Sequence, residues 1–290
     1  MYGRWIILIG LYCCSAYIVP SGNEPACLSV SCENGGTLQK EFCQCICTDE
    51  YTGLLCETAI GHSEWPRGEY GLPTSTFGCP EEDRFGWKPG HINLTLPRTS
   101  RAQIWNDLLD YTLEPHIMGP FHTHIMQMNF CLRKNLSQSS STDENWPPGE
   151  YCLYKVGDTC PSENFTEGSI TIHGYEFDVR DLGGELPNVT YHTGNSSLQL
   201  HFCCRYDGQA YDPITLPNTF PFILFKGSTA STCQNIDQMT SKEEFFFMTN
   251  EIVNWEFNGE FPNVNKSGRH VGIPYCYYEP TGKTFGFTGS

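Results

Sequence analysis

The chain has 290 residues, which is enough for one or two domains with a sizeable core. Its 33 acidic residues outnumber its 17 basic residues, and the formal net charge is −16. Such a charge would repel a phosphate backbone, so we expect no nucleic-acid partner. Sixteen cysteines indicate a disulfide framework that forms in an oxidising compartment.

The first 20 residues are typical of a secretory signal peptide. Arg4 supplies the initial charge, residues 5–12 form an apolar run, and residues 14–16 are small, as a cleavage site requires. The run is shorter than the roughly 20 residues that span a bilayer, and no later run is long enough. We therefore expect a secreted, extracellular glycoprotein without a membrane span. Its candidate glycosylation sites are the asparagines of six Asn-x-Ser/Thr sequons: Asn93, Asn135, Asn164, Asn188, Asn195 and Asn265.

Residues 23–57 are rich in cysteine and too few to bury a useful core, so covalent bonds must stabilise them. Asn34-Gly35-Gly36 predicts a tight turn. The spacing Cys45-x-Cys47, followed by Tyr51-Thr-Gly53 and Cys56, resembles the end of an EGF-like module. This resemblance implies a small separate module with the pairs Cys27–Cys43, Cys32–Cys45 and Cys47–Cys56. Residues 58–64 then form a linker.

Three similar units follow, at about 65–133, 146–205 and 220–278. Each begins with an apolar strand, places a cysteine nine residues after a large side chain, and ends with an aromatic residue and a cysteine on a strand. Alternating polarity predicts the main strands at 69–72, 127–133, 151–155, 170–179, 198–206, 222–225, 245–249 and 275–279. A helix is predicted at 100–111, where Ser100 and Gln103 form a capping box.

The expected fold class is therefore mainly β and disulfide-rich: a small EGF-like module followed by an all-β domain with three internal repeats. A trefoil-like arrangement and a β-sandwich, in which the repeats divide between two sheets, both fit the pattern. Residues 280–290 form a C-terminal tail.

The repeat also predicts the disulfides of the three units. The simplest symmetric scheme joins the early cysteine of each unit to its late cysteine, which gives Cys79–Cys131, Cys160–Cys203 and Cys233–Cys276. Cys152 and Cys204 remain, and both lie in the second unit. Neighbouring strand residues point to opposite faces, so Cys203 and Cys204 can form different bridges, and we expect Cys152–Cys204. The counterparts of that pair are Gly71 and Leu132 in the first unit, and Phe225 and Tyr277 in the third.

Two groups are candidates for ligand chemistry. His122 and His124 would point to the same side of a strand, as zinc ligands often do, but two ligands are too few for a tetrahedral site, so we expect no metal. Trp87 lies in a Gly/Pro-rich stretch, 86–90, that predicts a loop, where an aromatic face can stack on a sugar ring. Trp65 and Trp146 open two of the units and are expected in the core. The sequence contains no hydrolase, metalloprotease or nucleotide-binding motif, so we expect neither an enzyme nor a cofactor.

Residues 65–279 resemble the apextrin C-terminal (ApeC) domain. The motifs are Trp65-Pro-Arg-Gly-Glu-Tyr-Gly-Leu-Pro73 with Gly78-Cys79-Pro80, Tyr151-Cys-Leu-Tyr154, Phe202-Cys-Cys-Arg205 and Tyr275-Cys-Tyr-Tyr-Glu279. The resemblance implies a secreted, disulfide-rich domain linked to innate immunity or to matrix and adhesion, and some members resemble receptors for bacterial cell wall. We expect a secreted, non-enzymatic pattern-recognition protein whose partner is bacterial cell-wall glycan, as peptidoglycan or muramyl peptide. The alternative is an extracellular matrix or cell-adhesion protein that binds a matrix component.

Overall fold

The structure is a computed structural model, and it describes residues 31–39, 44–47, 51–52, 55–56, 58–59, 65–80, 86–95, 102–106, 115–122, 125–134, 146–174, 178–192, 197–249, 253–267 and 270–281. The chain divides into two compact units, Met1–Gly61 and His62–Ser290. All regular structure in the described ranges is β-strand, and these ranges contain no helix. No helix among them is long and apolar enough to cross a membrane.

The first unit consists of two small antiparallel pairs of strands. β1 (Thr37–Gln39) pairs with β2 (Gln44–Ile46), and β3 (Tyr51–Thr52) pairs with β4 (Thr58–Ala59). Asn34 and Gly35 both have positive φ, as the predicted turn requires. The expected bridges Cys32–Cys45 and Cys47–Cys56 are both present, whereas the expected Cys27–Cys43 pair lies outside the described residues.

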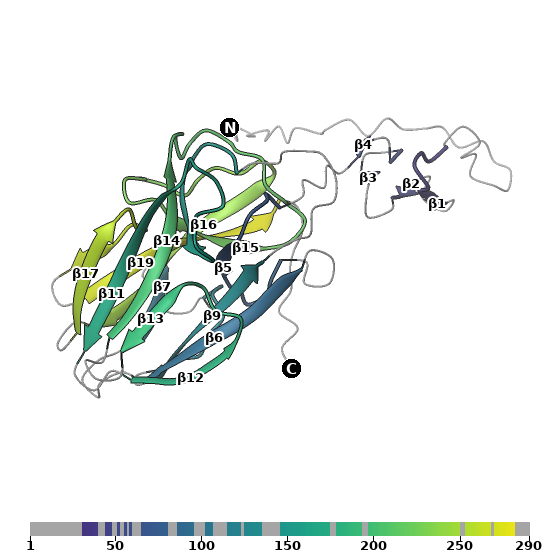
Figure 1. Cartoon of the computed structure of the whole chain (residues 1–290). Helices are drawn as coiled ribbons and strands as arrows, with labels where there is room; N and C mark the ends of the chain where they lie inside the picture. Colours follow the sequence, from purple (N-terminus) through teal and green to yellow (C-terminus); the bar gives the residue numbers. More distant parts are fainter. Residues whose placement is uncertain are drawn as a thin grey trace, which may run out of the picture. The chain divides into compact units, whose positions relative to one another are not determined.

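The second unit contains a curled sheet of 15 strands, which form three sets of five (Figure 1). The first set is β5 (Tyr70–Pro73), β6 (Trp87–Thr95), β7 (Ala102–Asn106), β8 (Phe121–His122) and β9 (Ile125–Arg133). The second is β10 (Glu150–Lys155), β11 (Thr166–Gly174), β12 (Asp178–Gly184), β13 (Val189–His192) and β14 (Ser197–Tyr206). The third is β15 (Phe222–Lys226), β16 (Met239–Thr249), β17 (Val253–Gly259), β18 (Asn265–Ser267) and β19 (His270–Pro280).

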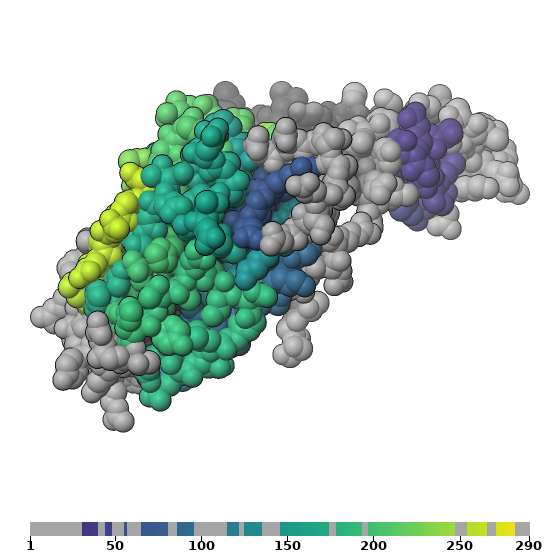
Figure 2. Space-filling view, viewed as in Figure 1, coloured from purple at the N-terminus to yellow at the C-terminus, as the bar shows by residue number. Residues whose placement is uncertain are grey.

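The three sets share one pairing scheme. The first strand of each set pairs with the last, and the last strand also pairs with the second and the fourth. The third strand instead joins a neighbouring set: β12 pairs with β6, β17 with β11, and β7 with β16. Figure 1 shows β17 beside β11, and Figure 2 shows the yellow residues of the third set along the edge of the second. The repeats are therefore interlocked in a cycle within one sheet, which is the threefold arrangement, and they are not divided between two sheets.

Strand register places the closing cysteines at equivalent positions. Cys131, Cys203 and Cys276 lie opposite Leu72, Leu153 and Leu224. The four described bridges of the unit are the pairs that the repeat predicted: Cys79–Cys131, Cys160–Cys203, Cys152–Cys204 and Cys233–Cys276. Cys203 and Cys204 belong to different core clusters, as opposite faces of a strand require.

One expected equivalence is wrong. In the third repeat Tyr277 lies opposite Ile223, so Ile223 and not Phe225 is the counterpart of Cys152. Eleven residues separate the aligned position Phe222 from Cys233, against nine in the other repeats. A shift of two residues keeps each side chain on the same face of its strand, so polarity alone could not reveal the shift.

The predicted helix at 100–111 is also wrong where the structure describes it. Ala102–Asn106 is strand β7, which pairs with β16 from Ala102↔Met248 to Asn106↔Glu244. The segment forms a strand despite its local helix-capping pattern, because without it the edge of β16 would be unpaired at this position. The predicted strand at 170–179 is in fact two strands, β11 and β12, which lie in different parts of the sheet.

Alternate residues of the short first strands enter two separate core clusters. One is an aromatic cluster that contains Trp65, Trp146, Tyr70 and Phe222. Its rings meet edge to face, for example Trp65 with Phe222 at 4.9 Å and Tyr70 with Trp146 at 4.8 Å, a favoured geometry. Trp65 and Trp146 are fully buried, which confirms their expected core role.

Candidate functional site

Trp87, the sequence candidate for sugar stacking, does not present a ring face to solvent. It begins β6, is only 3% exposed, and packs edge-on against Trp65 at a centroid distance of 5.3 Å. The expected loop at 86–90 is wrong, because all but its first residue belong to β6. Gly90 is required there, since the carbonyl oxygen of Glu185 stands 1.7 Å from where a Cβ would be. Trp87 is therefore a core residue.

The His122 and His124 pair falls largely outside the described residues. The backbone of β8 ends at His122, opposite Ile125, whereas the His122 side chain and all of His124 are not described. Among the described side chains, no group of three or more His, Cys, Asp or Glu is arranged to hold a metal ion.

An exposed aromatic ring is found instead on a surface formed by two neighbouring segments, 207–217 and 233–239. Tyr211 is 71% exposed, compared with 44% for Tyr191 on β13. Its carbonyl oxygen accepts a hydrogen bond from Asn235 Nδ2 at 3.4 Å. Thr215 Oγ1 donates to Asp237 Oδ2 at 3.0 Å between the same two segments. We define the Tyr211 surface as the five exposed residues Tyr211, Asp212, Thr215, Asn235 and Asp237.

Alternating polarity explains why these side chains face outward. Ile214 and Ile236 are buried and form a parallel bridge between the two segments. Thr215 and Asp237 follow them directly and therefore point to solvent. The backbone is fixed by hydrogen bonds from Ile214 N to Asn235 O at 3.0 Å and from Asp237 N to Ile214 O at 3.0 Å.

Gln234 is buried beneath the surface and joins the two segments by a side-chain hydrogen bond. Its side chain is 1% exposed, its Nε2 donates to Asp212 O at 2.7 Å, and its Oε1 accepts from Glu150 N at 2.8 Å. Its own carbonyl accepts from the Tyr278 hydroxyl at 2.8 Å. The other two repeats place Pro80 and Pro161 after the equivalent cysteine, and proline has no side-chain amide to make these bonds. The third repeat is thus built to hold the Tyr211 surface rigidly.

The chemistry of the Tyr211 surface suits a polyhydroxylated ligand. The flat ring can stack on a sugar face, while carboxylate, hydroxyl and amide groups can exchange hydrogen bonds with sugar hydroxyls. Asp207 begins the first segment, and its hydrogen bonds from Arg205 hold the pKa of its carboxyl below the ordinary value. That ion pair anchors the start of the segment instead of contributing to a ligand site.

A second polar cluster is buried where the first and third repeats meet. Glu244, 1% exposed, accepts hydrogen bonds from His116 Nδ1 at 2.6 Å, from His116 N at 3.0 Å and from the Tyr275 hydroxyl at 2.7 Å. The His116 ring stacks on Tyr277 at 4.0 Å. Burial alone would raise the pKa of Glu244, but the bonds from His116 and Tyr275 outweigh it and hold the pKa below the ordinary value.

This cluster departs from the threefold repeat. Register makes Glu244 equivalent to Gly90 and Gly168, which lie opposite phenylalanines where Glu244 lies opposite Tyr275. Among the described residues no group of three or more His, Cys, Asp or Glu at the cluster could hold a metal ion, and its one further charged neighbour is Lys242, whose Nζ lies 3.5 Å from Glu244 Oε1. We therefore interpret it as a polar clamp between repeats, which holds residue 116 against β16.

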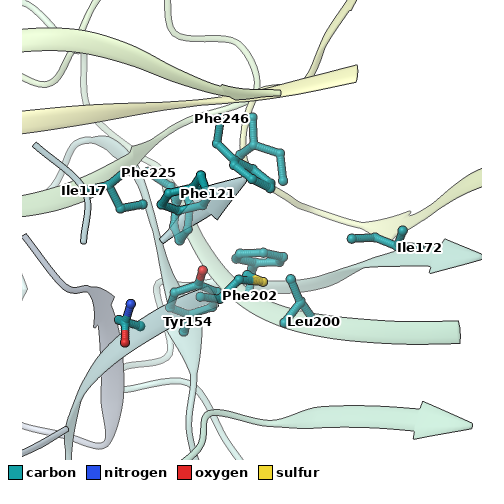
Figure 3. A pocket seen from close by; sticks show the side chains of 11 residues that line it. Ile117, Phe121, Tyr154, Ile172, Leu200, Phe202, Phe225 and Phe246 are labelled. Carbon is teal, nitrogen blue, oxygen red and sulfur yellow. The ribbon is translucent and has the colours of Figure 1, made fainter. Parts of the chain in front are cut away.

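The core contains a small apolar cavity, which is lined among others by Ile117, Phe121 and Phe246 (Figure 3). Its volume is about 30 Å³, and three of its lining residues, Met128, Leu200 and Ile273, are equivalent in the three repeats. Tyr154 and Phe202 stack beside it with ring centroids 5.4 Å apart. The space is enough for a water molecule and too small for a sugar ring, so the cavity is a packing feature of the core.

The sequons differ in accessibility. Asn164 and Asn265 are exposed, while Asn93 and Asn188 are half-buried. Asn188 Nδ2, the atom that a glycan would modify, donates to Gly157 O at 2.6 Å. Asn135 and Asn195 lie outside the described residues.

The fold defines a class of protein: an all-β domain with threefold repetition and a disulfide in every repeat, as is typical of extracellular proteins. Residues 65–278 match the family ApeC, described as the C-terminal domain of apextrin, and the chain belongs to this family. It is thus an apextrin-like protein. Neither a curated protein nor a solved structure matched the chain.

Sequence reasoning missed the Tyr211 surface. Asp207-Gly208 is typical of a turn, and it marks the start of the first segment. No local signal distinguished Tyr211 from the many buried tyrosines, because the contacts between its segment and residues 233–239 join parts of the chain more than 20 residues apart.

Proposed function

We propose that this protein is a secreted, non-enzymatic pattern-recognition protein of innate immunity, which binds bacterial cell-wall glycan through the Tyr211 surface. The observation that carries the proposal is the exposed Tyr211 ring on two cross-braced segments, with hydrogen-bonding side chains on both sides. A rigid surface of this kind loses little conformational entropy when a ligand binds. The family resemblance favours peptidoglycan or its muramyl peptides as the glycan.

We also propose that residues 23–57 form an EGF-like module that acts as a spacer or a protein-binding unit. The bridges Cys32–Cys45 and Cys47–Cys56, and the turn at Asn34, support this assignment. Secretion after removal of residues 1–20 is part of the same proposal, and it is supported by the number of disulfides.

The experiment is a pull-down of the purified full chain on insoluble peptidoglycan, with muramyl dipeptide as competitor. We expect binding that muramyl dipeptide reduces, and that Tyr211→Ala weakens by at least about tenfold, since stacking and polar contacts together contribute more than about 1.4 kcal/mol. Tyr191→Ala is the matched control, because Tyr191 is an exposed tyrosine on β13, outside the Tyr211 surface, and it should bind normally.

Each other outcome has a definite meaning. Retention on host matrix without binding to peptidoglycan would favour the adhesion alternative. Release of soluble sugar or peptide from the pellet would show an enzyme. Normal peptidoglycan binding by Tyr211→Ala would place the ligand elsewhere on the molecule.

A further inference from the structure

Two arginines occupy equivalent places in the first and second repeats. Each follows the closing cysteine by two residues, and each lies opposite a tyrosine in the first two residues of the first strand: Arg133 opposite Tyr70, and Arg205 opposite Tyr151. Both arginines are 3% exposed. The two tyrosine hydroxyls also make the same bond, to the carbonyl of the residue four positions earlier. The surroundings of the two guanidinium groups are therefore comparable.

Arg205 is fully paired. Its Nε and Nη2 donate to the two carboxylate oxygens of Asp207, at 2.6 and 2.7 Å, and its Nη1 donates to Trp146 O. This is the bidentate fork that matches the planar geometry of guanidinium and carboxylate. The buried charge is thereby neutralised within its own repeat.

Arg133 has no carboxylate partner among the residues that the structure describes, and its guanidinium hydrogen-bonds instead to the hydroxyl of Tyr70, which is neutral because burial raises its pKa. Its Nε and Nη1 are buried, and neither has a hydrogen-bond partner among the residues that the structure describes. The sequence explains the difference at one position, because the residue two after Arg133 is Asn135, where the second repeat has Asp207. An asparagine has no charge to neutralise a guanidinium. A buried cation without an anionic partner is strongly unfavourable, so such a group is poised to bind an anion.

We propose that Arg133 is a binding site for the carboxylate of a small ligand, which takes the place that Asp207 has beside Arg205. The carboxylate oxygens receive hydrogen bonds from the guanidinium fork, and the binding is independent of the Tyr211 surface. Trp87, opposite Arg133 on β6, and Tyr70, opposite it on β5, flank the site. The small exposure of Arg133 restricts entry to a slender carboxylate group, whether free or at the end of a larger molecule.

The direct test is a thermal-unfolding titration of the full chain with sodium acetate, at constant ionic strength maintained with sodium chloride. We expect the Tm to rise with acetate concentration in the wild type, as it does for a ligand that binds only the folded state. Arg133→Met should abolish the rise. Arg180→Met, which removes an exposed arginine paired with Asp178 at 3.2 Å, is the control and should keep it.

The stability of the variants without acetate gives a second readout. Arg133→Met should leave the Tm within about 2 °C of the wild type, because it removes an unpaired buried charge. Arg205→Met should lower the Tm by roughly 10 °C, because it breaks the ion pair with Asp207 and leaves the buried carbonyl of Trp146 without its donor.

An internal partner for Arg133 would overturn the proposal. Residues 81–83 are Glu-Glu-Asp, and they lie outside the described residues. If one of them neutralises Arg133, acetate will give no Tm shift, and Arg133→Met will lose as much stability as Arg205→Met.

A pair of sugars distinguishes the sources of the carboxylate. N-acetylmuramic acid carries a lactyl carboxylate, and N-acetylglucosamine lacks it. A Tm shift with the first sugar alone, absent in Arg133→Met, assigns the site to a carboxylate that is attached to a sugar. A shift with acetate but with neither sugar assigns it to a small free carboxylate. Tyr211→Ala should retain the acetate response, so failure of this site and failure of the proposed glycan surface are separable.

Discussion

Removal of the extra disulfide of the second repeat should destabilise the protein less than its loop length suggests. Cys152–Cys204 and Cys79–Cys131 both join residues 52 positions apart, and all four cysteines are buried. The two bridges differ in one respect. Cys160–Cys203 already links the same two parts of the chain as Cys152–Cys204, whereas no other described bridge links the parts that Cys79–Cys131 joins.

The magnitude follows from the length of the loop that each bridge closes. Closing a 52-residue loop stabilises by about 4.1 kcal/mol on the chain-entropy model. With Cys160–Cys203 in place, Cys152–Cys204 closes only the stretch from 152 to 160 and from 203 to 204, a loop of about nine residues that contributes about 2.6 kcal/mol. Each double alanine variant removes two buried sulfur atoms, so the cavity term largely cancels between them. The expected difference between the two losses is about 1.5 kcal/mol.

The assay is equilibrium unfolding in guanidinium chloride, followed by tryptophan fluorescence, for C79A/C131A and C152A/C204A. The first variant should lose more free energy of unfolding than the second. The quadruple variant C152A/C204A/C160A/C203A should lose about 1.5 kcal/mol more than the sum of its two parent variants, since each parent retains one bridge over the same loop. Equal losses in C79A/C131A and C152A/C204A, or simple additivity in the quadruple variant, would refute the nested-loop reasoning.

Three further predictions concern single residues. Trp87→Ala should lower the free energy of unfolding by about 3–5 kcal/mol, measured by denaturant titration, because the ring is core; a loss below about 1 kcal/mol would contradict its burial. The pKa of Glu244 is lowered, so its contribution to the free energy of unfolding is complete above the ordinary pKa of 4.5 and is lost as the pH falls through the lowered pKa. Glu244→Gln should therefore reduce the loss of stability at acid pH, measured by denaturant titration at several pH values. An unchanged loss of stability at acid pH would contradict the role of Glu244 as a clamp. Glycopeptide mapping should find a glycan at Asn164 and none at Asn188, whose Nδ2 is already bonded; occupancy at Asn188 would refute this.

The cysteine pattern made much of the fold predictable. Cysteines recur at related spacing in the three repeats, and each must pair with another. This restricts both the strand order and the bridges, and the structure has the pairs that the pattern indicated. The same pattern could not show the exchange of β7, β12 and β17 between repeats. That exchange depends on pairing between distant strands, which leaves no mark in local polarity.

The errors have physical causes that local sequence does not contain. Residues 102–106 carry helix-compatible side chains but form β7, because the edge of β16 needs a partner. Pro89 and Gly90 resemble loop residues, yet they lie in β6, where the Glu185 backbone crosses too closely for a side chain. The prediction therefore placed Trp87 on a loop, although the residue is buried. Tyr211 was overlooked because its segment is held by Gln234, which lies 22 residues after Asp212 in the sequence.

The central claim is that the Tyr211 surface binds cell-wall glycan, and one comparison tests it directly. Binding of the wild type, Tyr211→Ala and Tyr191→Ala to insoluble peptidoglycan should be measured side by side, after denaturant titration has shown equal stability. Because Tyr211 is largely exposed, its replacement should leave stability within about 0.5 kcal/mol. The account predicts that Tyr211→Ala alone loses binding by about tenfold or more. Equal binding by all three proteins would contradict it.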